Sequence, residues 1–234
     1  MSDQNHHREP PLGEDKAPSA GAIPQLGRAP LNSPVEADAL ALFRHAFSAK
    51  QCQAWLTGLI EQLHWHKDYY EVHGRRFHIP RLQAWVANAG IQYSYSNNLL
   101  AVQPWSPLLR AIKRAVEARV GHRFNAVLIT YYRDGDDHVT WHADDERELG
   151  DAPVIASLSL GATRTFQYKP TDREAVEGLP LDEGDLLLMR PAFQQSWLHR
   201  VPAEPGVVTG RINLTFRQVM AGEAFERQRE QSVS

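Results

Sequence analysis

The sequence predicts a mainly β (α+β) domain, a β-sandwich or jelly roll with helices in its N-terminal half. Three observations favour this class. From residue 125 onward the chain is a succession of short strand-like segments. Turn-forming Asp and Gly residues separate several of them, as at 134–137 and 182–185. Helical periodicity is confined to residues between 48 and 120, and no internal repeat is visible, which is typical of a layered β fold.

The bulk composition bounds the protein class. The 234 residues are enough for one domain with a substantial core, and 42% hydrophobic with 23% charged residues is typical of a globular chain. The formal charge of −3 argues against a generally basic coat, so any nucleic acid must meet a local patch. A single cysteine, Cys52, excludes an internal disulfide and suits a reducing compartment. With no membrane span or secretion signal visible, we expect a monomer in the cytoplasm, or in the nucleus if the source is eukaryotic.

The chain ends are expected to be tails. Residues 1–35 carry six prolines among small and charged residues, a composition that cannot bury enough surface to offset its ordering entropy. Residues 221–234 are also predicted to be disordered, which leaves a domain at 36–220.

The N-terminal part of this domain should supply a strand at 40–47 and two packing helices. Ser48 to Gln51 has the form of a capping box that starts the first helix. Ser106 and Pro107 introduce the second, at 107 to about 120. Both helices carry one apolar stripe, formed by Cys52, Trp55, Leu56, Leu59, Ile60 and Leu63 in the first and by Leu108, Leu109, Ile112, Val116 and Val120 in the second.

Between the helices, residues 65–81 are polar, aromatic and basic, with a possible hairpin tip at 72–77. Such a stretch could bind a sugar-phosphate backbone and unstacked bases. From its composition, it could equally be an ordinary solvated loop. Residues 82–95 should form strands around a turn at 88–90, with Tyr93 and Tyr95 on one face. The later strands are expected at 125–132, 138–144, 153–160, 163–169, 185–190, 196–201 and 210–219.

A His-x-Asp motif at His142 and Asp144 is the first sign of chemistry. On an extended strand, residues i and i+2 face the same side, so the two side chains could bind one metal ion. Two ligands hold a divalent metal poorly, and the best third candidate is His199. Two His and one carboxylate leave coordination positions open, the arrangement found in non-haem Fe(II) oxygenases.

The segment 211–217 alternates strictly between polar and apolar residues. Its polar side carries Arg211, Asn213, Thr215 and Arg217. This side either faces water, as in an ordinary half-exposed strand, or faces inward, where two arginines need anionic partners. A dicarboxylate clamped bidentately by one arginine would serve, which describes a site for 2-oxoglutarate.

These motifs resemble the AlkB-type dioxygenases that dealkylate nucleic acids. Supporting segments are 125–135, 155–166 and 92–96, and the resemblance runs from about Phe43 to Val219. It implies a double-stranded β-helix (jelly roll) with flanking N-terminal helices. It further implies that His142, Asp144 and His199 hold Fe(II), with 2-oxoglutarate and O₂ as co-substrates. By resemblance, Arg211 and Tyr132 pair with the distal carboxylate of 2-oxoglutarate, and Asn213 and Arg217 support its metal-proximal end.

One departure from the family pattern is Thr130. Many relatives carry Asn at this place, two positions before the tyrosine that matches Tyr132, and that Asn helps to hold the co-substrate. Thr130 keeps a hydroxyl and lacks the amide.

The resemblance also implies a substrate and a reaction. The expected reaction is oxidative demethylation of 1-methyladenine and 3-methylcytosine in DNA or RNA, with release of succinate, CO₂ and formaldehyde. A nucleotide-recognition lid is expected at about 65–100, and the substrate-binding candidates are Tyr93, Tyr95, Trp141, Glu146, Arg75 and Arg76. Two alternatives are an oxygenase that acts on protein, lipid or a small molecule, and a non-catalytic metal-binding β-barrel.

Overall fold

The computed structural model describes residues 39–72, 75–91, 94–95, 98–99 and 101–220. Both expected tails, the hairpin tip at 73–74 and Tyr93 lie outside these residues. The strands are β1 (Leu40–Phe43), β2 (Tyr69–Val72), β3 (Arg75–His78), β4 (Leu82–Ala87), β5 (Ser94–Tyr95), β6 (Asn98–Leu99), β7 (Val102–Gln103), β8 (Ala126–Tyr132), β9 (Val139–His142), β10 (Ile155–Gly161), β11 (Arg164–Pro170), β12 (Glu177–Leu181), β13 (Leu186–Met189), β14 (Trp197–Val201) and β15 (Arg211–Arg217). The helices are α2 (Ala49–Gln62), α3 (Pro107–Val120), α4 (Pro191–Ser196) and the short 3₁₀ turn η1 (Arg147–Leu149).

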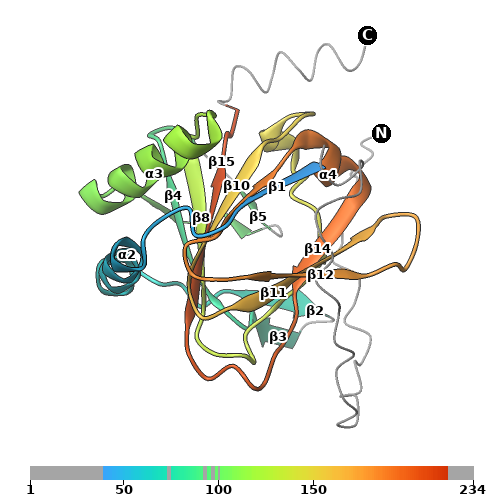
Figure 1. The fold of residues 1–234 in the computed structure, drawn as a ribbon. Coiled ribbons are helices and arrows are strands. Elements are labelled where there is room, and N and C mark those ends of the chain that lie inside the picture. The colour runs from blue at the N-terminus through green and yellow to red at the C-terminus, as the bar shows by residue number, and fades with distance from the viewer. Residues whose placement is uncertain (1–38, 73–74, 92–93, 96–97, 100, 221–234) are drawn as a thin grey trace.

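Two sheets form the body of the domain (Figure 1). The larger has the order β1-β13-β10-β15-β8-β4-β7 and the smaller the order β12-β11-β14-β9. Apart from the parallel pair β4 and β7, neighbouring strands are antiparallel. From β8 onward the chain passes back and forth between the sheets, with β8, β10, β13 and β15 in the larger and β9, β11, β12 and β14 in the smaller. This alternation is the jelly-roll topology, so the expected fold class is confirmed.

Helices α2 and α3 cover the outer face of the larger sheet (Figure 1). Ser48 caps α2 in a complete capping box, as expected, and Ser106 caps α3 by accepting a hydrogen bond from the Leu109 N–H. Apolar side chains from both helices, including Cys52 and Ile112, pack against the sheet in one cluster. Ile60 was expected on the apolar stripe, but its side chain is 40% exposed.

A second apolar cluster lies on the inner side of the larger sheet. It includes Trp85 and Leu128 from the larger sheet, Phe166 and Tyr168 from the smaller one, and Phe193 from α4. Because this cluster fills only part of the space between the sheets, the remainder can hold a polar cavity.

Several element boundaries differ from the sequence prediction. The strand expected at 40–47 ends at Phe43, and the strand expected at 138–144 ends at His142. Strand β12 was not predicted because Gly178 and Pro180 lie within it. Proline is tolerated there since β12 is an edge strand. Helix α4 was also not predicted, because its single turn is too short to show a helical period.

Residues 65–100, where a lid was expected, contain two small hairpins in their described part. Strands β2 and β3 pair with each other, and so do β5 and β6. The chain runs from β3 through Ile79 and Pro80 directly into β4. Among the described residues, no helix is long and apolar enough to cross a membrane.

Candidate active site

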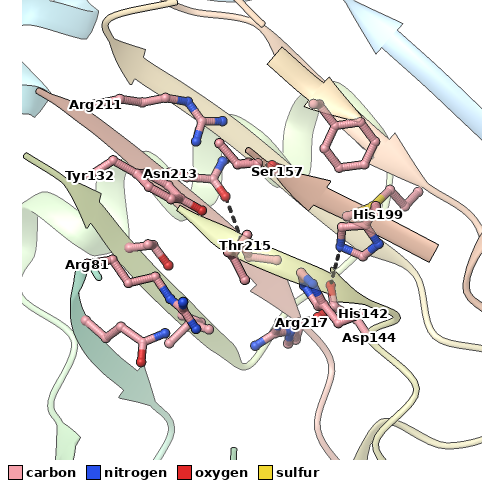
Figure 2. Close-up of a pocket in the computed structure, with 17 residues that line it drawn as sticks. Arg81, Tyr132, His142, Asp144, Ser157, His199, Arg211, Asn213, Thr215 and Arg217 are labelled. Carbon is pink, nitrogen blue, oxygen red and sulfur yellow. Dashed lines mark hydrogen bonds and ion pairs between the residues drawn. The ribbon is translucent and has the colours of Figure 1, made fainter. Parts of the chain in front are cut away.

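A polar cavity lies between the two sheets, and side chains from both of them line it (Figure 2). The larger sheet and the residue before β4 contribute Arg81, Gln83, Leu128, Thr130, Tyr132, Ser157, Met189, Arg211, Asn213, Thr215 and Arg217. The smaller sheet and the segment after β9 contribute Val139, His142, Asp144, Phe166, His199 and Val201.

The three predicted metal ligands meet in this cavity. Ligand atoms of His142, Asp144 and His199 all lie within 4.8 Å of one another, and His199 Nε2 is 4.0 Å from Asp144 Oδ2. Strands β9 and β14 pair His142 directly with His199, which explains how residues far apart in sequence come together.

Asp144 reaches the site by a route that differs from the sequence argument. It was expected on the same strand as His142, but β9 has ended before it. Instead, its backbone N–H donates to Gln194 Oε1 at 2.9 Å, and Arg217 Nη2 donates to its Oδ1 at 2.5 Å. With Oδ1 bound by Arg217, Oδ2 is the oxygen that faces His199.

The protonation states suit metal binding. Burial, and then repulsion from His142, lower the pKa of His199 to about 3, so its imidazole is neutral at physiological pH. Burial alone would raise the pKa of Asp144, but the positive charge of Arg217 and the two neighbouring histidines lower it below its usual range. A metal binds a neutral imidazole and an ionised carboxylate, and His199 and Asp144 are in these states.

Neighbouring groups orient the two imidazoles. The Thr140 carbonyl accepts a hydrogen bond from His142 Nδ1–H at 2.8 Å, which leaves Nε2 as the ligand atom. The ring of His199 stacks on Phe166, with a centroid distance of 5.2 Å. The donor set of two nitrogens and one carboxylate oxygen, buried and open to one cavity, fits Fe(II).

The polar side of β15 faces the cavity and not the solvent. Every residue of this strand is buried, and Arg211 and Arg217 are each 2% exposed. Arg217 is neutralised by Asp144. Arg211 donates from Nη2 to Ser159 Oγ at 2.9 Å, while its Nε and Nη1 have no hydrogen-bond partner among the described residues. Burial lowers the pKa of Arg211, so the surrounding protein disfavours its charge.

Tyr132 lies beside Arg211, as expected. The guanidinium carbon of Arg211 is 5.3 Å from the Tyr132 ring centroid, and that of Arg164 is 5.4 Å from it. Arg164 is held in turn by backbone carbonyls of Asp134, Asp137 and Pro202. Glu204 Oε2 lies 3.6 Å from Arg164 Nε and offsets the charge of Arg164. The two unpaired nitrogens of Arg211 therefore make this end of the cavity complementary to a carboxylate.

Asn213 lines the cavity, but its side chain is occupied by the protein. Its Nδ2 donates to Ser157 Oγ at 2.8 Å and to the Leu158 carbonyl at 3.1 Å, and its Oδ1 accepts from Thr215 at 3.0 Å. Asn213 was predicted to support the co-substrate. These hydrogen bonds show that the Asn213 side chain links β15 to β10.

Four of the predicted substrate-binding residues, Trp141, Glu146, Arg75 and Arg76, are not among the described residues that line the cavity. Trp141 is on the outer face of the smaller sheet, where Arg200 and Lys169 approach its ring to 4.5 and 5.0 Å. An irregularity in the pairing of β9 with β14 places both Val139 and His142 toward the cavity, which turns Trp141 outward.

The other described candidates lie at η1 and on β3 and β5. Glu146 is half-buried at the start of η1. Arg75 and Arg76 are exposed on β3, and the guanidinium of Arg76 lies 4.4 Å above the Tyr69 ring. The backbone of Tyr95 is in β5.

Arg81 and Gln83 are among the cavity residues that were not predicted as site residues. Arg81 is 5% exposed and donates from Nη1 to the His138 carbonyl at 3.0 Å. Gln83 is 2% exposed, and its Oε1 has no hydrogen-bond partner among the described residues. The available signal was their i, i+2 spacing at the start of a strand that is otherwise apolar.

Comparison with known proteins supports this geometry. A family model of the 2OG-Fe(II) oxygenase superfamily matches residues 39–217. Rat alpha-ketoglutarate-dependent dioxygenase alkB homolog 3 is 36% identical over 223 residues, which cover 91% of this chain and 75% of the rat protein. Human DNA oxidative demethylase ALKBH2 is 40% identical over 158 residues, which cover 64% of this chain and 60% of the human protein.

A solved structure described as OsALKBH1 shares the fold, with a TM-score of 0.55 and 16% identity over 77% of this chain and 98% of that one. The buried triad fits the metal that this superfamily uses, and the family match spans the whole β domain. The chain therefore belongs to the 2OG-Fe(II) oxygenase superfamily, as an AlkB-type dioxygenase that depends on Fe(II) and 2-oxoglutarate.

Proposed function

We propose that this protein demethylates N-alkylated bases, 1-methyladenine and 3-methylcytosine, in DNA or RNA. The observation that carries the proposal is the meeting of the His142, Asp144 and His199 triad with a buried, incompletely paired Arg211 in one cavity. A relative that is 40% identical is named a DNA oxidative demethylase.

The triad would hold Fe(II), and Arg211 with Tyr132 would bind the distal carboxylate of 2-oxoglutarate. When bound, iron, 2-oxoglutarate and O₂ supply an oxidation that inserts one oxygen atom into a C–H bond of the N-methyl group and places the other in succinate, with loss of CO₂. The resulting N-hydroxymethyl base breaks its C–N bond, which releases formaldehyde and leaves the unmodified base.

The chain's own contribution is positioning and exclusion of water. Asp144 stays ionised beside Arg217, and His199 stays neutral, so neither side chain must move a proton before it binds metal. Phe166 and Val201 form apolar walls at the triad. These groups protect the site from bulk water, which strengthens the charge contacts within it.

The lid at about 65–100 would bring the nucleic acid to this cavity. Arg75 and Arg76 are exposed on β3, close in sequence to the cavity residue Arg81. Exposed Tyr69 and Phe77 accompany them on the same hairpin. Cationic and aromatic groups together suit a sugar-phosphate backbone and unstacked bases, although the whole chain carries a net charge of −3.

The direct test is an assay on oligonucleotides that carry one 1-methyladenine or 3-methylcytosine. The protein is loaded with Fe(II) and 2-oxoglutarate without oxygen and is then exposed to air. We expect equal amounts of repaired base and formaldehyde, together with succinate. Comparing the yield of repaired base in single- and double-stranded DNA and RNA shows which nucleic acid the protein prefers.

Matched controls are Asp144→Asn, which removes a metal ligand, and Asp145→Asn, which changes the exposed neighbouring residue. The first should abolish repair, and the second should retain bound metal. Methylated bases left intact in all four contexts would contradict the proposal. If a protein, lipid or small molecule stimulated succinate release instead, that alternative substrate class would be supported.

We also propose that the protein acts as a monomer in the cytoplasm, or in the nucleus of a eukaryotic source. In the described part of the chain, the exposed large hydrophobic side chains are distributed over separate elements, as with Ile60 on α2 and Phe77 on β3. Sedimentation equilibrium should give the mass of one 26.4 kDa chain, and a dimer mass would contradict this.

A further inference from the structure

Gln83 lies in the cavity wall on β4, at one end of the row of larger-sheet strands that line the cavity. Its strand, β4, pairs with β8 so that Gln83 lies opposite Thr130, and β8 pairs with β15 so that Thr130 lies opposite Asn213. All three side chains line the cavity. Three polar residues on neighbouring strands therefore form one row across the sheet, in the same wall as Arg211 and Arg217.

The row contains two amides, and their hydrogen bonding differs. Asn213 uses its amide nitrogen for Ser157 and Leu158 and its oxygen for Thr215. Gln83 is also buried, at 2% exposure, yet its side-chain oxygen has no partner among the described residues. A buried polar group without a hydrogen bond is destabilising, so a retained amide of this kind points to a ligand in the cavity.

The chemistry of the cavity defines what that ligand contact would be. The occupant is 2-oxoglutarate, whose carboxylates accept hydrogen bonds and whose charge Arg211 can neutralise. Arg81 already adds a third buried arginine to the wall, whereas the amide N–H of Gln83 adds a donor without further charge. The two ends of a glutamine amide exchange by a half-turn of the side chain, so Gln83 can present its N–H to the cavity.

We propose that Gln83 binds 2-oxoglutarate by donating its amide N–H. In this arrangement Gln83 on β4 supplies an amide contact to 2-oxoglutarate. Many relatives have an Asn for this contact at the position of Thr130 on β8. The inference rests on the use of 2-oxoglutarate at the same cavity as the proposed function. It does not depend on which substrate is then oxidised.

The test compares Gln83→Leu with Gln53→Leu. Both substitutions replace an amide by an apolar side chain of similar size, but Gln53 is exposed on α2. Calorimetric titration of 2-oxoglutarate into the Mn(II)-loaded full-length proteins measures binding without turnover. We expect Gln83→Leu to raise the Kd for 2-oxoglutarate about tenfold to 100-fold, the effect of losing one hydrogen bond to a charged group. Gln53→Leu should leave the Kd unchanged.

Two further measurements separate ligand binding from a structural role. Adding Thr130→Asn to Gln83→Leu returns an amide to the adjacent strand, so the Kd should recover most of its loss. The ligand-free Gln83→Leu protein should melt no lower than the wild type, because the amide it loses has no partner there.

A Kd for 2-oxoglutarate unchanged by Gln83→Leu would overturn the inference, as would a Kd that rises only together with a lower melting temperature and no recovery by Thr130→Asn. A changed KM for the methylated oligonucleotide with an unchanged Kd would overturn it as well, in favour of a contact to the base. Wild-type protein that binds 2-oxoglutarate but repairs no methylated base would contradict the proposed substrate and leave this inference standing.

Discussion

Arg211→Met tests whether the positive end of the cavity exists to bind the distal carboxylate of 2-oxoglutarate. The wild-type guanidinium is 2% exposed, donates once to Ser159 and keeps two nitrogens without partners. Methionine fills similar space and carries no donor. Removing one member of a buried, hydrogen-bonded charge pair costs about 2–5 kcal/mol. At about 1.4 kcal/mol for each factor of ten, the Kd for 2-oxoglutarate should rise roughly 30- to 4,000-fold.

The assay is calorimetric titration of Mn(II)-loaded protein with 2-oxoglutarate and with 2-oxobutyrate, which lacks the distal carboxylate. Wild-type protein should strongly prefer 2-oxoglutarate, and Arg211→Met should bind the two acids almost equally. Arg200→Met is the matched control, since Arg200 is on β14 beside His199 but contacts Trp141 outside the cavity. If Arg211→Met still bound 2-oxoglutarate as selectively over 2-oxobutyrate as wild type does, Arg211 would not be the partner of the distal carboxylate.

The same variant makes a prediction about stability. Burial lowers the pKa of Arg211, which means that its charge is disfavoured in the ligand-free protein. Arg211→Met should therefore melt at the same temperature as wild type or higher without ligand, and it should lose the increase in melting temperature that 2-oxoglutarate produces in wild type. A large loss of stability in the ligand-free variant would show that Arg211 is mainly structural.

Three other predictions concern groups near the site and in the scaffold. Gln194→Leu removes the acceptor for the Asp144 N–H and should weaken Mn(II) binding about 10- to 100-fold. The control Gln195→Leu, on the exposed side of α4, should leave Mn(II) binding unchanged. Equal Mn(II) affinities of the two variants in a metal titration would contradict this. Burial raises the pKa of Cys52 to about 11, so a thiol reagent at pH 8 should label it only after unfolding. Rapid labelling of the native protein would be inconsistent with the packing of Cys52 between α2 and the larger sheet. Burial alone would raise the pKa of Asp137, but its hydrogen bonds and ion pair with Arg133 lower it, so its stabilisation is present above the unfolded pKa of about 4 and is lost as pH falls below it. Urea unfolding at pH 7 and pH 3 should therefore show a smaller acid loss for Asp137→Asn than for wild type, and equal losses would contradict the ion pair.

The central features of the site could be predicted because they leave local patterns. The alternation of residues 211–217 defined which side chains share a face, and the buried strand β15 places that polar face in the cavity. The spacing of His142 and Asp144, with His199 as third ligand, identified the metal triad that the cavity brings together.

Other features depend on tertiary contacts that leave no such pattern. Asp144 is held by Gln194 and Arg217 after its strand has ended, so strand periodicity was the wrong reason for the right residue. The irregularity of β9 that turns Trp141 outward is a property of pairing with β14. Gln83 becomes notable only once the partners of every amide in the cavity are known.

The most direct test of the central claim is a crystal structure of the protein prepared without oxygen with Mn(II) and 2-oxoglutarate. One anomalous peak should lie between His142 Nε2, Asp144 Oδ2 and a nitrogen of His199, with the distal carboxylate of 2-oxoglutarate against Arg211. A metal peak away from these three side chains, or a dicarboxylate oriented away from Arg211, would contradict the site described for this enzyme.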